Sequence, residues 1–569
     1  MSGAYGADVP TGMLTFPMGR QEEHLSENSG RPPRRFHVPR RWLFVLAAVA
    51  LLAQMAFAMV TTAVRQTPTI DEPVYVGTAV VYVQQHSLRY NPEHPPLGKL
   101  IIGSGLVFAH PHLDSDFKGD QTALGKRLLY ESGNDPGRLM LWARLPVIVL
   151  TLLFGLVVLS FARELVGRAG GLVALALYAL SPDVIAHGSL ATLDVPACGF
   201  LLTSVWLLWR ARRRPLLHLP LAGAALGAAM ATKMSLLAAV PLLLLLAVVS
   251  VWRVPGLGTA AKVRRGVAAA SGVALVALAV VWATYLVVDP QLRWTAPGDL
   301  PVIRGTRGLL VDWLPFPQPF RDGMRIQFNY EYQVWGGFLF GRHYHGALWY
   351  YLPTALLVKT PLGMLALWSA GAVAMLAVRR LRPAAPYVLI PPALLLAVAM
   401  GGTRDLGVRY ALFVPMFLAV AVAAVVAVRQ RWAYVVTAAL VLFVAVSSLR
   451  TYPYYLPYSN EAFGGPSKTH LRLHDSNVDW GQDLGRLADR LDERYPNEQV
   501  WLVYKGAGVP SYYGIEAADP REVPPDDVHG LLVVSDSSIA TAEGRLAALL
   551  EGSTPVDEVG HSITIFRRP

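Results

Sequence analysis

The sequence predicts a polytopic α-helical membrane protein of about eleven spans that carries a small C-terminal α/β domain. Its 569 residues are 53% hydrophobic and 16% charged, and the mean hydropathy is +0.39. A soluble domain carries about a quarter charged residues, so this composition is typical of a chain that lies mostly in a bilayer. The single cysteine, Cys198, excludes an internal disulfide framework and a thiolate zinc cluster.

The expected spans are apolar stretches that can cross about 30 Å of hydrocarbon, some of them short or interrupted. They lie near residues 43–64, 142–161, 171–188, 195–209, 217–231, 234–252, 266–288, 347–377, 386–401, 408–428 and 432–449. Counted alternately from a cytoplasmic N-terminus, they leave basic loops in the cytoplasm, as the positive-inside rule requires. The net charge of +11 therefore reports topology and indicates no nucleic-acid partner. The loops 65–141 and 289–346 and the tail from about residue 450 are expected outside.

Three regions are expected along the chain. Residues 1–42 are polar and rich in Gly and Pro, which predicts a disordered, basic, cytoplasmic N-terminus. Residues 43–450 form the membrane domain, whose first span is a signal anchor because no small-residue cleavage site accompanies it. Residues 451–569 are expected to form an extracytoplasmic soluble domain. Its predicted strands are 499–505, 530–537 and 561–568, and its predicted helices are 483–494 and 539–551.

Two adjacent carboxylates, Asp71 and Glu72, follow the first span in the sequence TIDEPVYVG. The same outer loop contains EHPPLGK, which contributes His94 and Lys99 around a proline turn. Local structure offers one interpretation, since a carboxylate favours the start of the helix expected over residues 74–85 and proline suits a first helical turn. An acid pair beside basic groups at one membrane surface is also the composition of an active site.

A third carboxylate, Asp194, lies in the sequence TLDVP at the outer turn between the third and fourth spans. It either caps the fourth span, with Thr192 as a rival cap, or serves a site, because a carboxylate kept at membrane depth is costly and needs a partner. Asp183 and His187 lie upstream in the same hairpin, in position to line the same cavity.

The motifs DEP, EHPPLGK and TLDVP resemble those of the GT-C type glycosyltransferases that use polyprenyl-phosphate sugars, over roughly residues 40–450. The nearest types are the protein O-mannosyltransferases and the lipid A aminoarabinose transferases, which are glycosyltransferase family 39-like. The resemblance implies that Asp71 is the catalytic general base, that Glu72 orients the acceptor or its partner, and that Asp194 is the second acid. Leu193 stands where the family often has threonine.

Basic residues are expected to hold the donor phosphate. The resemblance favours Arg409, whose planar fork binds phosphate through two hydrogen bonds, and it places His94 and Lys99 nearby. Lys359 lies deep in an apolar stretch and needs an anion or a cavity, whereas Lys233 and Arg404 are expected to snorkel at span ends. Oligosaccharyltransferases of the same superfamily use a divalent cation, so Mg²⁺ or Mn²⁺ between Asp71 and Asp194 is the alternative.

The outer loop 289–346 is long, aromatic and charged, as functional lids and binding loops are. It either contacts a sugar or forms an interfacial aromatic belt. His343 and His345 have the spacing of metal ligands, but no third ligand is near them in the sequence, so no metal is predicted there. The expected substrate contacts are Tyr330, Glu331, Arg342, His343 and His345.

The segment DSNVDWGQDL, residues 475–484, begins like a calcium loop. Trp480 occupies the position that requires glycine and Arg486 the position of the terminal carboxylate, so that interpretation fails. The segment resembles one in bacterial membrane proteins of the same group, and its role does not follow from the sequence. It is otherwise a turn and helix cap that starts the outer domain.

The sequence as a whole predicts an inverting transferase that moves a sugar from a polyprenyl-phosphate donor to an acceptor at the outer surface. The acceptor is a protein, a glycan or a lipid, and the sugar stays open, with mannose as the family default. A lipid or sugar-lipid transporter without chemistry also explains the spans and buried charges, but not an acid pair confined to one surface. A non-catalytic scaffold protein is the third alternative.

Overall fold

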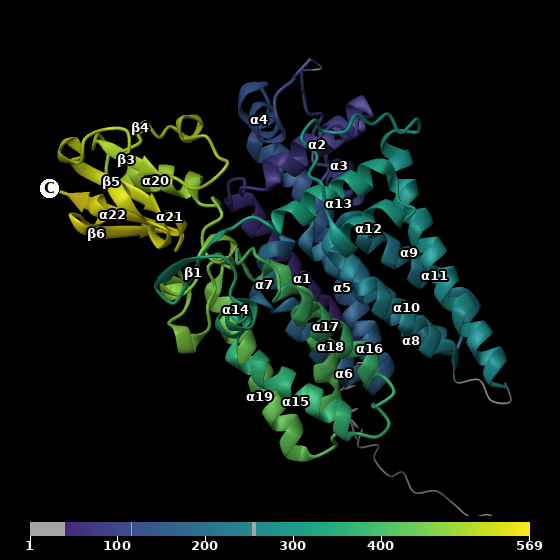
Figure 1. The fold of residues 1–569 in the computed structure, drawn as a ribbon. Coiled ribbons are helices and arrows are strands. Elements are labelled where there is room, and N and C mark those ends of the chain that lie inside the picture. Colours follow the sequence, from purple (N-terminus) through teal and green to yellow (C-terminus); the bar gives the residue numbers. More distant parts are fainter. Residues whose placement is uncertain (1–39, 115, 253–257) are drawn as a thin grey trace, which may run out of the picture. The chain divides into compact units, whose positions relative to one another are not determined.

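Long helices dominate the computed structural model, which describes residues 40–114, 116–252 and 258–569 (Figure 1). The predicted N-terminal region 1–42 lies almost wholly outside the described residues, and residues Phe44–Pro569 form the unit described below. Within these described residues, six helical stretches are long and apolar enough to cross a membrane. They are Arg41–Arg65 (in α1, Arg40–Arg65), α5 (Pro136–Val166), α9 (Pro215–Thr232), Met234–Trp252 (η2 and α10, Val240–Trp252), α11 (Thr259–Val288) and α19 (Arg431–Thr451).

Two predicted spans are broken. The stretch 171–188 divides into α6 (Arg168–Ala179) and α7 (Pro182–Gly188), which meet at 62°. The stretch 347–377 divides into α14 (Tyr351–Lys359) and α15 (Leu362–Ala377), which meet at 117°. A proline follows each break and explains it. Proline has no backbone N–H to donate to the helix, and it disfavours the helical conformation in the residue before it. Each pair counted as one span gives at most eight candidates in the described chain, so the expected number of eleven is not confirmed.

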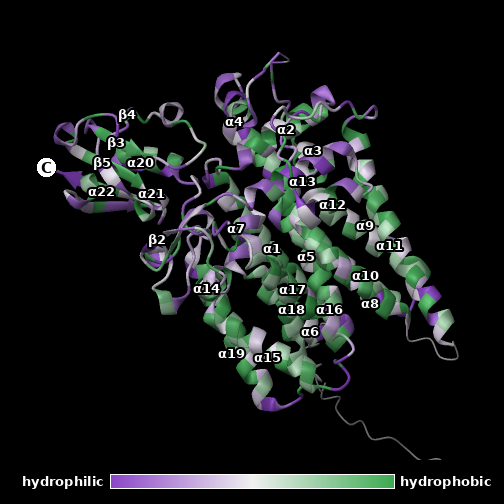
Figure 2. Ribbon diagram, in the orientation of Figure 1, coloured by the Kyte–Doolittle hydropathy of each residue, from purple (hydrophilic) through white to green (hydrophobic). Residues whose placement is uncertain are grey.

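The remaining apolar helices are shorter. They are α8 (Asp194–Ala211), α16 (Ala385–Val388), α17 (Ile390–Ala399) and α18 (Phe413–Val426). The α18 helix packs against α5, α6, α8 and α15, and nearly all of its side chains are buried. Its row of alanines lets neighbouring helices approach closely. Figure 2 shows hydrophobic residues along α5, α10, α15 and α19, with hydrophilic residues at the helix ends.

Short helices cover one end of the long ones. The region 65–141 contains α2 (Glu72–Gln85), α3 (Pro96–Leu106) and α4 (Gln121–Lys126), with α3 packed on α2, α5 and α9. The region 289–346, expected as a loop, contains α12 (Gly305–Trp313), α13 (Gln318–Tyr330) and a hairpin of β1 (Gly336–Leu339) and β2 (Arg342–His345). Gln327 of α13 donates to the Glu93 carbonyl at 3.0 Å, so the two outer regions meet.

A five-stranded mixed sheet ends the chain in the order β4-β3-β5-β7-β6. The predicted strands correspond to β3 (Val500–Val503), β5 (Gly530–Ser535) and β7 (Ile563–Arg568), and the predicted helices to α20 (Leu484–Arg494) and to α21 (Asp536–Ala540) with α22 (Gly544–Glu551). Alternation along β5 sets the layers, since Leu531 and Val533 face α20 and Leu532 and Val534 face α22. Two edge strands were not predicted, β4 (Ala517–Ala518) and β6 (Thr554–Val559).

Residues 452–482 join the last long helix to this sheet through short 3₁₀ turns. Many of their polar side chains are buried, including Asn477 and Asp479, both 0% exposed. Trp480 is also buried. Polar groups are buried only where they find hydrogen-bond partners, and one partner of Asn477 lies beside the site described next.

Candidate active site

The Asp71 carboxylate meets Arg409. Asp71 occupies the N-cap position of α2, yet its side chain makes no capping bond. Instead, Arg409 Nη1 donates to Asp71 Oδ2 at 2.5 Å across 338 positions of sequence. The Asp71 side chain is 27% exposed, which leaves the carboxylate accessible. The capping interpretation of Asp71 is therefore wrong for its side chain.

Aromatic rings hold the Arg409 guanidinium. Its Cζ lies 4.4 Å from the Trp480 ring centroid and 5.1 Å from that of Tyr410. Its buried Nε has no hydrogen-bond partner among the described residues. Arg stacked in this way keeps its fork in a fixed plane while its remaining N–H groups can bind an anion.

Asp194 forms a second pair with Lys233. Asp194 starts α8 with its side chain 5% exposed, and the Lys233 ammonium at the end of α9 donates to Asp194 Oδ1. Lys233 was expected to snorkel toward the membrane surface, and that expectation is wrong. Its Nζ lies 5.2 Å from the Tyr410 ring centroid, so the same tyrosine contacts Lys233 and Arg409.

Tyr75 and His94 show that the two pairs converge. Burial and the carboxylates of Asp71 and Asp194 raise the pKa of the Tyr75 phenol well above its usual value, against the charge of Arg409. The His94 ring lies 5.8 Å from the Tyr75 ring, and its buried Nδ1 has no partner in the described chain. Burial together with Lys233 and Lys99 lowers the pKa of His94 well below its usual value. His94 therefore faces this site as a neutral imidazole.

Glu72 ties the loops of the two acids together. Its carboxylate is fully buried and accepts Nε of Arg144 at 2.7 Å and Nη2 at 2.6 Å. The same carboxylate accepts the amide of Ala191 at 2.7 Å and the amide and hydroxyl of Thr69 at 2.9 and 3.0 Å. Burial alone would raise its pKa, but the charge and bonds of Arg144 lower it below the usual value. With no lone pair left for a substrate, Glu72 is a positioning residue.

Two predicted phosphate ligands bind the protein itself. Lys99 Nζ is buried and donates to the carbonyls of Asn91 at 2.8 Å and His94 at 2.5 Å and to Asn91 Oδ1 at 3.1 Å, which closes the EHPP turn. Lys359 Nζ donates to the carbonyls of Leu456 at 2.5 Å and Asn477 at 2.8 Å and lies 3.5 Å from Asp183. Neither ammonium is directed at a phosphate position beside Arg409.

The segment 475–483 fixes both sides of the Asp71–Arg409 pair, a role that the sequence did not reveal. Asn477 Oδ1 accepts the Val408 amide at 2.9 Å beside Arg409. The carbonyl of Trp480 accepts the Ile70 amide at 3.0 Å beside Asp71. The Trp480 ring also contacts His187, whose ring nitrogens are buried without partners in the described residues.

The region 289–346 reaches the site only in part. Arg404, expected to snorkel, lies 3.3 Å from Glu331 and stacks on Tyr330 and Tyr410 at 5.4 and 5.9 Å. Tyr330 and Glu331 therefore lie near Tyr410, one of the two aromatic residues that contact Arg409. The other predicted contacts lie on the hairpin: Arg342 is exposed, and His343 and His345 face Glu543.

The sequence did not point to Tyr75, Tyr410 or Trp480 as parts of this arrangement, and it led us to expect Lys233 at the membrane surface. Tyr410 could have been predicted from the sequence, because it directly follows Arg409. Trp480 could not, because only the folded chain brings it to Arg409. A cavity of about 370 Å³, lined by Arg212, Arg265 and Arg380 among others, lies at the opposite end of α8 from Asp194. It is remote from these carboxylates.

One known protein family matches part of the chain. Residues 48–289 match the family model described as dolichyl-phosphate-mannose-protein mannosyltransferase, and the match contains all three acid-bearing motifs. This part of the chain, less than half of its length, is therefore similar to a mannosyltransferase family, as the motifs predicted. This favours an enzyme over the transporter alternative. No curated protein matches the chain in sequence.

Several solved structures resemble the chain at low identity. ArnT from Cupriavidus metallidurans in the apo state is 15% identical, with 93% of this chain and 98% of that chain covered and a TM-score of 0.47. The protein O-mannosyltransferase Pmt1-Pmt2 complex of S. cerevisiae, bound to the sugar donor, is 18% identical. The match covers 43% of this chain and 33% of that chain, with a TM-score of 0.34. The oligosaccharyltransferase AglB from Archaeoglobus fulgidus is 11% identical. The match covers 90% of this chain and 73% of that chain, with a TM-score of 0.47.

The buried pair of Glu72 and Arg144 predicts a large stability effect. Glu72→Gln leaves Arg144 as an uncompensated buried charge, which costs about 3–5 kcal/mol. Asp114→Asn, which breaks the exposed pair with Arg127, should cost at most about 1 kcal/mol. Melting temperatures in detergent check this, and equal losses in the two variants would contradict the assigned role of Glu72.

The buried Asp479 predicts a pH dependence of stability. Burial raises the pKa of the Asp479 carboxyl to about 7, against about 3.9 in an unfolded chain. Between these values the folded protein keeps a proton that the unfolded chain has released, so stability falls as pH rises from about 4 to about 7. Asp479→Asn should flatten this decline in melting temperature, whereas exposed Asp489→Asn should not. Parallel pH profiles for the wild type and Asp479→Asn would argue against a protonated Asp479.

Proposed function

We propose that the chain transfers a sugar from a polyprenyl-phosphate donor to an acceptor hydroxyl at the outer membrane surface, with inversion at the anomeric carbon. The observation that carries this proposal is the convergence of Asp71 with Arg409 and of Asp194 with Lys233 around Tyr75 and Tyr410. Two carboxylates and two cations from distant parts of the chain supply a base for the acceptor and positive charge for a leaving phosphate.

The reaction is a single displacement. Asp71 accepts the proton of the acceptor hydroxyl as its oxygen bonds to the anomeric carbon. The bond from that carbon to the phosphate oxygen breaks on the opposite face, and the lipid phosphate leaves with the electron pair. Because attack and departure occur on opposite faces, the configuration inverts.

Arg409 has two successive partners in this scheme. Without donor it binds Asp71, and its fork suits a phosphate through two parallel hydrogen bonds. A docked phosphate competes for the guanidinium and frees the Asp71 carboxylate to receive a proton. Lys233 stays on Asp194 and adds positive charge on the other side of Tyr410.

Mg²⁺ or Mn²⁺ is the alternative source of positive charge, and the donor set does not favour it. A shared cation would need oxygens of both Asp71 and Asp194, yet each carboxylate already accepts a hydrogen bond from a fixed cation. We propose that Arg409 and Lys233 replace the metal. Added Mn²⁺ should then leave the rate of transfer unchanged.

The substrates to assay first come from the description of the matched family, which names dolichyl phosphate mannose as donor and protein as acceptor. A serine or threonine hydroxyl, a glycan and a lipid hydroxyl offer the same acceptor chemistry. Single-turnover transfer from a radiolabelled polyprenyl-phosphate sugar tests the reaction for each acceptor class.

The general base predicts the effect of one substitution. Asp71→Asn keeps the size of the side chain and still accepts a hydrogen bond from Arg409, but its amide cannot take a proton. Single-turnover transfer should fall by roughly a hundredfold or more, while Asp114→Asn, an exposed acid of the same outer loop, should transfer normally. A folded Asp71→Asn enzyme that transfers at the wild-type rate would leave Asp71 with only a structural role.

Topology predicts a labelling pattern. We place the N-terminus in the cytoplasm and the outer loops and the C-terminal sheet outside, on the basis of the charge distribution. In a Cys198→Ala background, cysteines at exposed Thr306 and Ser511 should react with an impermeant reagent in intact cells. A cysteine at exposed Thr259 should react only after permeabilisation. The reverse pattern would move the site to the cytoplasmic face.

A further inference from the structure

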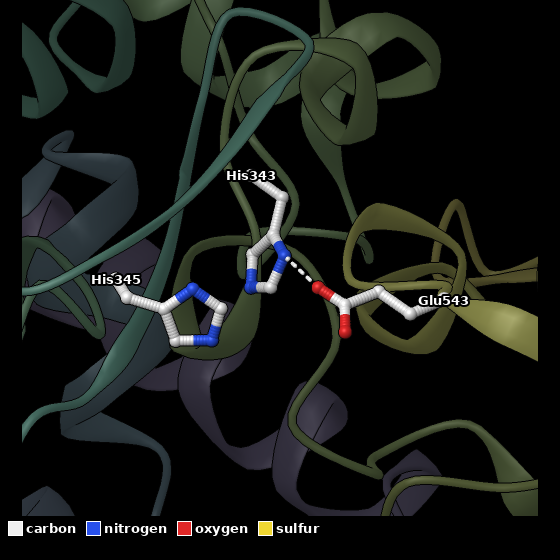
Figure 3. A group of neighbouring side chains, drawn as sticks. All are labelled: His343, His345 and Glu543. Carbon is white, nitrogen blue, oxygen red and sulfur yellow. Dashed lines mark hydrogen bonds and ion pairs between the residues drawn. The ribbon is translucent and has the colours of Figure 1, made fainter.

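We propose that His343, His345 and Glu543 form a zinc site that joins the β1–β2 hairpin to the C-terminal sheet region. One ligand atom from each residue lies within 4.8 Å of the other two (Figure 3). His343 Nδ1 donates to Glu543 Oε1 at 2.9 Å, and the two imidazole centroids are 4.9 Å apart. The sequence predicted no metal here because no third ligand is near the two histidines, and the fold supplies one from 200 positions away.

The hairpin holds the two imidazoles on one face. Residues two apart in a strand point to the same side, so His343 and His345 form one pair of ligands and Tyr344 points away. Strand β1 opposes them in register, with Gly336 against His345 and Phe338 against His343. A Cβ at Gly336 would lie 3.1 Å from His343 Nε2, so glycine leaves room for the ring.

The other side of the hairpin is anchored, which gives a metal a firm base. The Tyr344 hydroxyl donates to Asp405 at 2.8 Å, and the Phe340 amide donates to the Arg472 carbonyl at 2.9 Å. Glu543 occupies the N-cap position of α22 but makes no capping bond with its side chain. Its carboxylate, 68% exposed, is therefore available as a ligand.

The ligand types select zinc over the alkaline-earth ions. Two imidazoles and one carboxylate suit Zn²⁺, with bonds of about 2.0–2.2 Å and water as a fourth ligand, whereas Ca²⁺ and Mg²⁺ prefer oxygen. The ion takes the place of the hydrogen bond between His343 and Glu543. The imidazole proton of His343 then resides on Nε2, which leaves the Nδ1 lone pair for zinc, and rotation of the exposed His345 and Glu543 side chains closes the remaining gaps. Since Tyr344 holds Asp405 on the opposite face, the metal also restrains the loop that leads to Arg409.

Metal content tests the site without reference to transferase activity. The full-length protein, purified without an oligohistidine tag, is stripped with EDTA and titrated with ZnCl₂, and bound zinc is counted after gel filtration. We expect one equivalent for the wild type and for His110→Ala, an exposed histidine elsewhere. His345→Ala and Glu543→Gln should bind zinc on the order of tenfold more weakly or worse.

Co²⁺ substitution and melting temperature complete the test. Co²⁺ should give the visible absorption of a tetrahedral site in the wild type and not in His345→Ala. Zinc should raise the melting temperature of the wild type only, because a ligand that binds the folded state stabilises it. Equal melting temperatures without metal show that the variants fold. Zinc uptake that is absent in the wild type, or equal in the wild type and both variants, would overturn the proposal.

Discussion

The ion pair between Glu72 and Arg144 is the interaction on which the arrangement of the site depends. Both side chains are 0% exposed, and a buried charge of this kind persists only with a partner and a full set of hydrogen bonds. Arg144 supplies the charge and also donates to the carbonyls of Ala63, Gln66 and Thr67, which end the first long helix. Glu72 in turn fixes the Ala191 amide, three positions before Asp194.

The buried pair of Glu72 and Arg144 therefore positions the chain segments that carry Asp71 and Asp194. The segment 475–483 positions Arg409 in a similar way. Asn477 binds the backbone just before Arg409, and the Trp480 ring stacks on the Arg409 guanidinium. The Asp71 side chain itself is less constrained. Asp71 is partly exposed and makes a single bond to Arg409, as a group that must exchange partners requires.

Much of this arrangement was predictable from local sequence. The apolar stretches and the α2 and α3 helices follow from composition and proline positions, whereas Asp71 and Asp194 were singled out through the resemblance of short motifs to a known family. The broken helices before Pro182 and Pro361 could have been inferred from those prolines, but their angles depend on packing. The third ligand Glu543, the Trp480 ring and the partners of Lys359 could not, because each contact spans many residues and no local pattern records it.

The partners of the basic residues could not be predicted from the sequence for a related reason. Lys99 and Lys359 looked like phosphate ligands because a buried ammonium needs an anion or polar partners. Backbone carbonyls supplied those partners for Lys99, and carbonyls together with Asp183 supplied them for Lys359. Lys233 and Arg404 looked peripheral at span ends, yet both pair with acids beside Tyr410. Sequence position shows how deep a basic residue lies, but not which carboxylate or carbonyl it reaches.

The exchange of Arg409 between Asp71 and a phosphate is the central claim, and lipid binding tests it most directly. The measurement is the affinity of the purified protein for a polyprenyl phosphate that carries no sugar, compared among the wild type, Arg409→Lys and Asp71→Asn. Arg409→Lys should bind more weakly because the bidentate fork is lost although the charge remains. Asp71→Asn should bind as tightly as the wild type or more tightly, because its neutral amide competes less for the guanidinium. Equal weakening in both variants, or wild-type affinity in Arg409→Lys, would contradict the exchange.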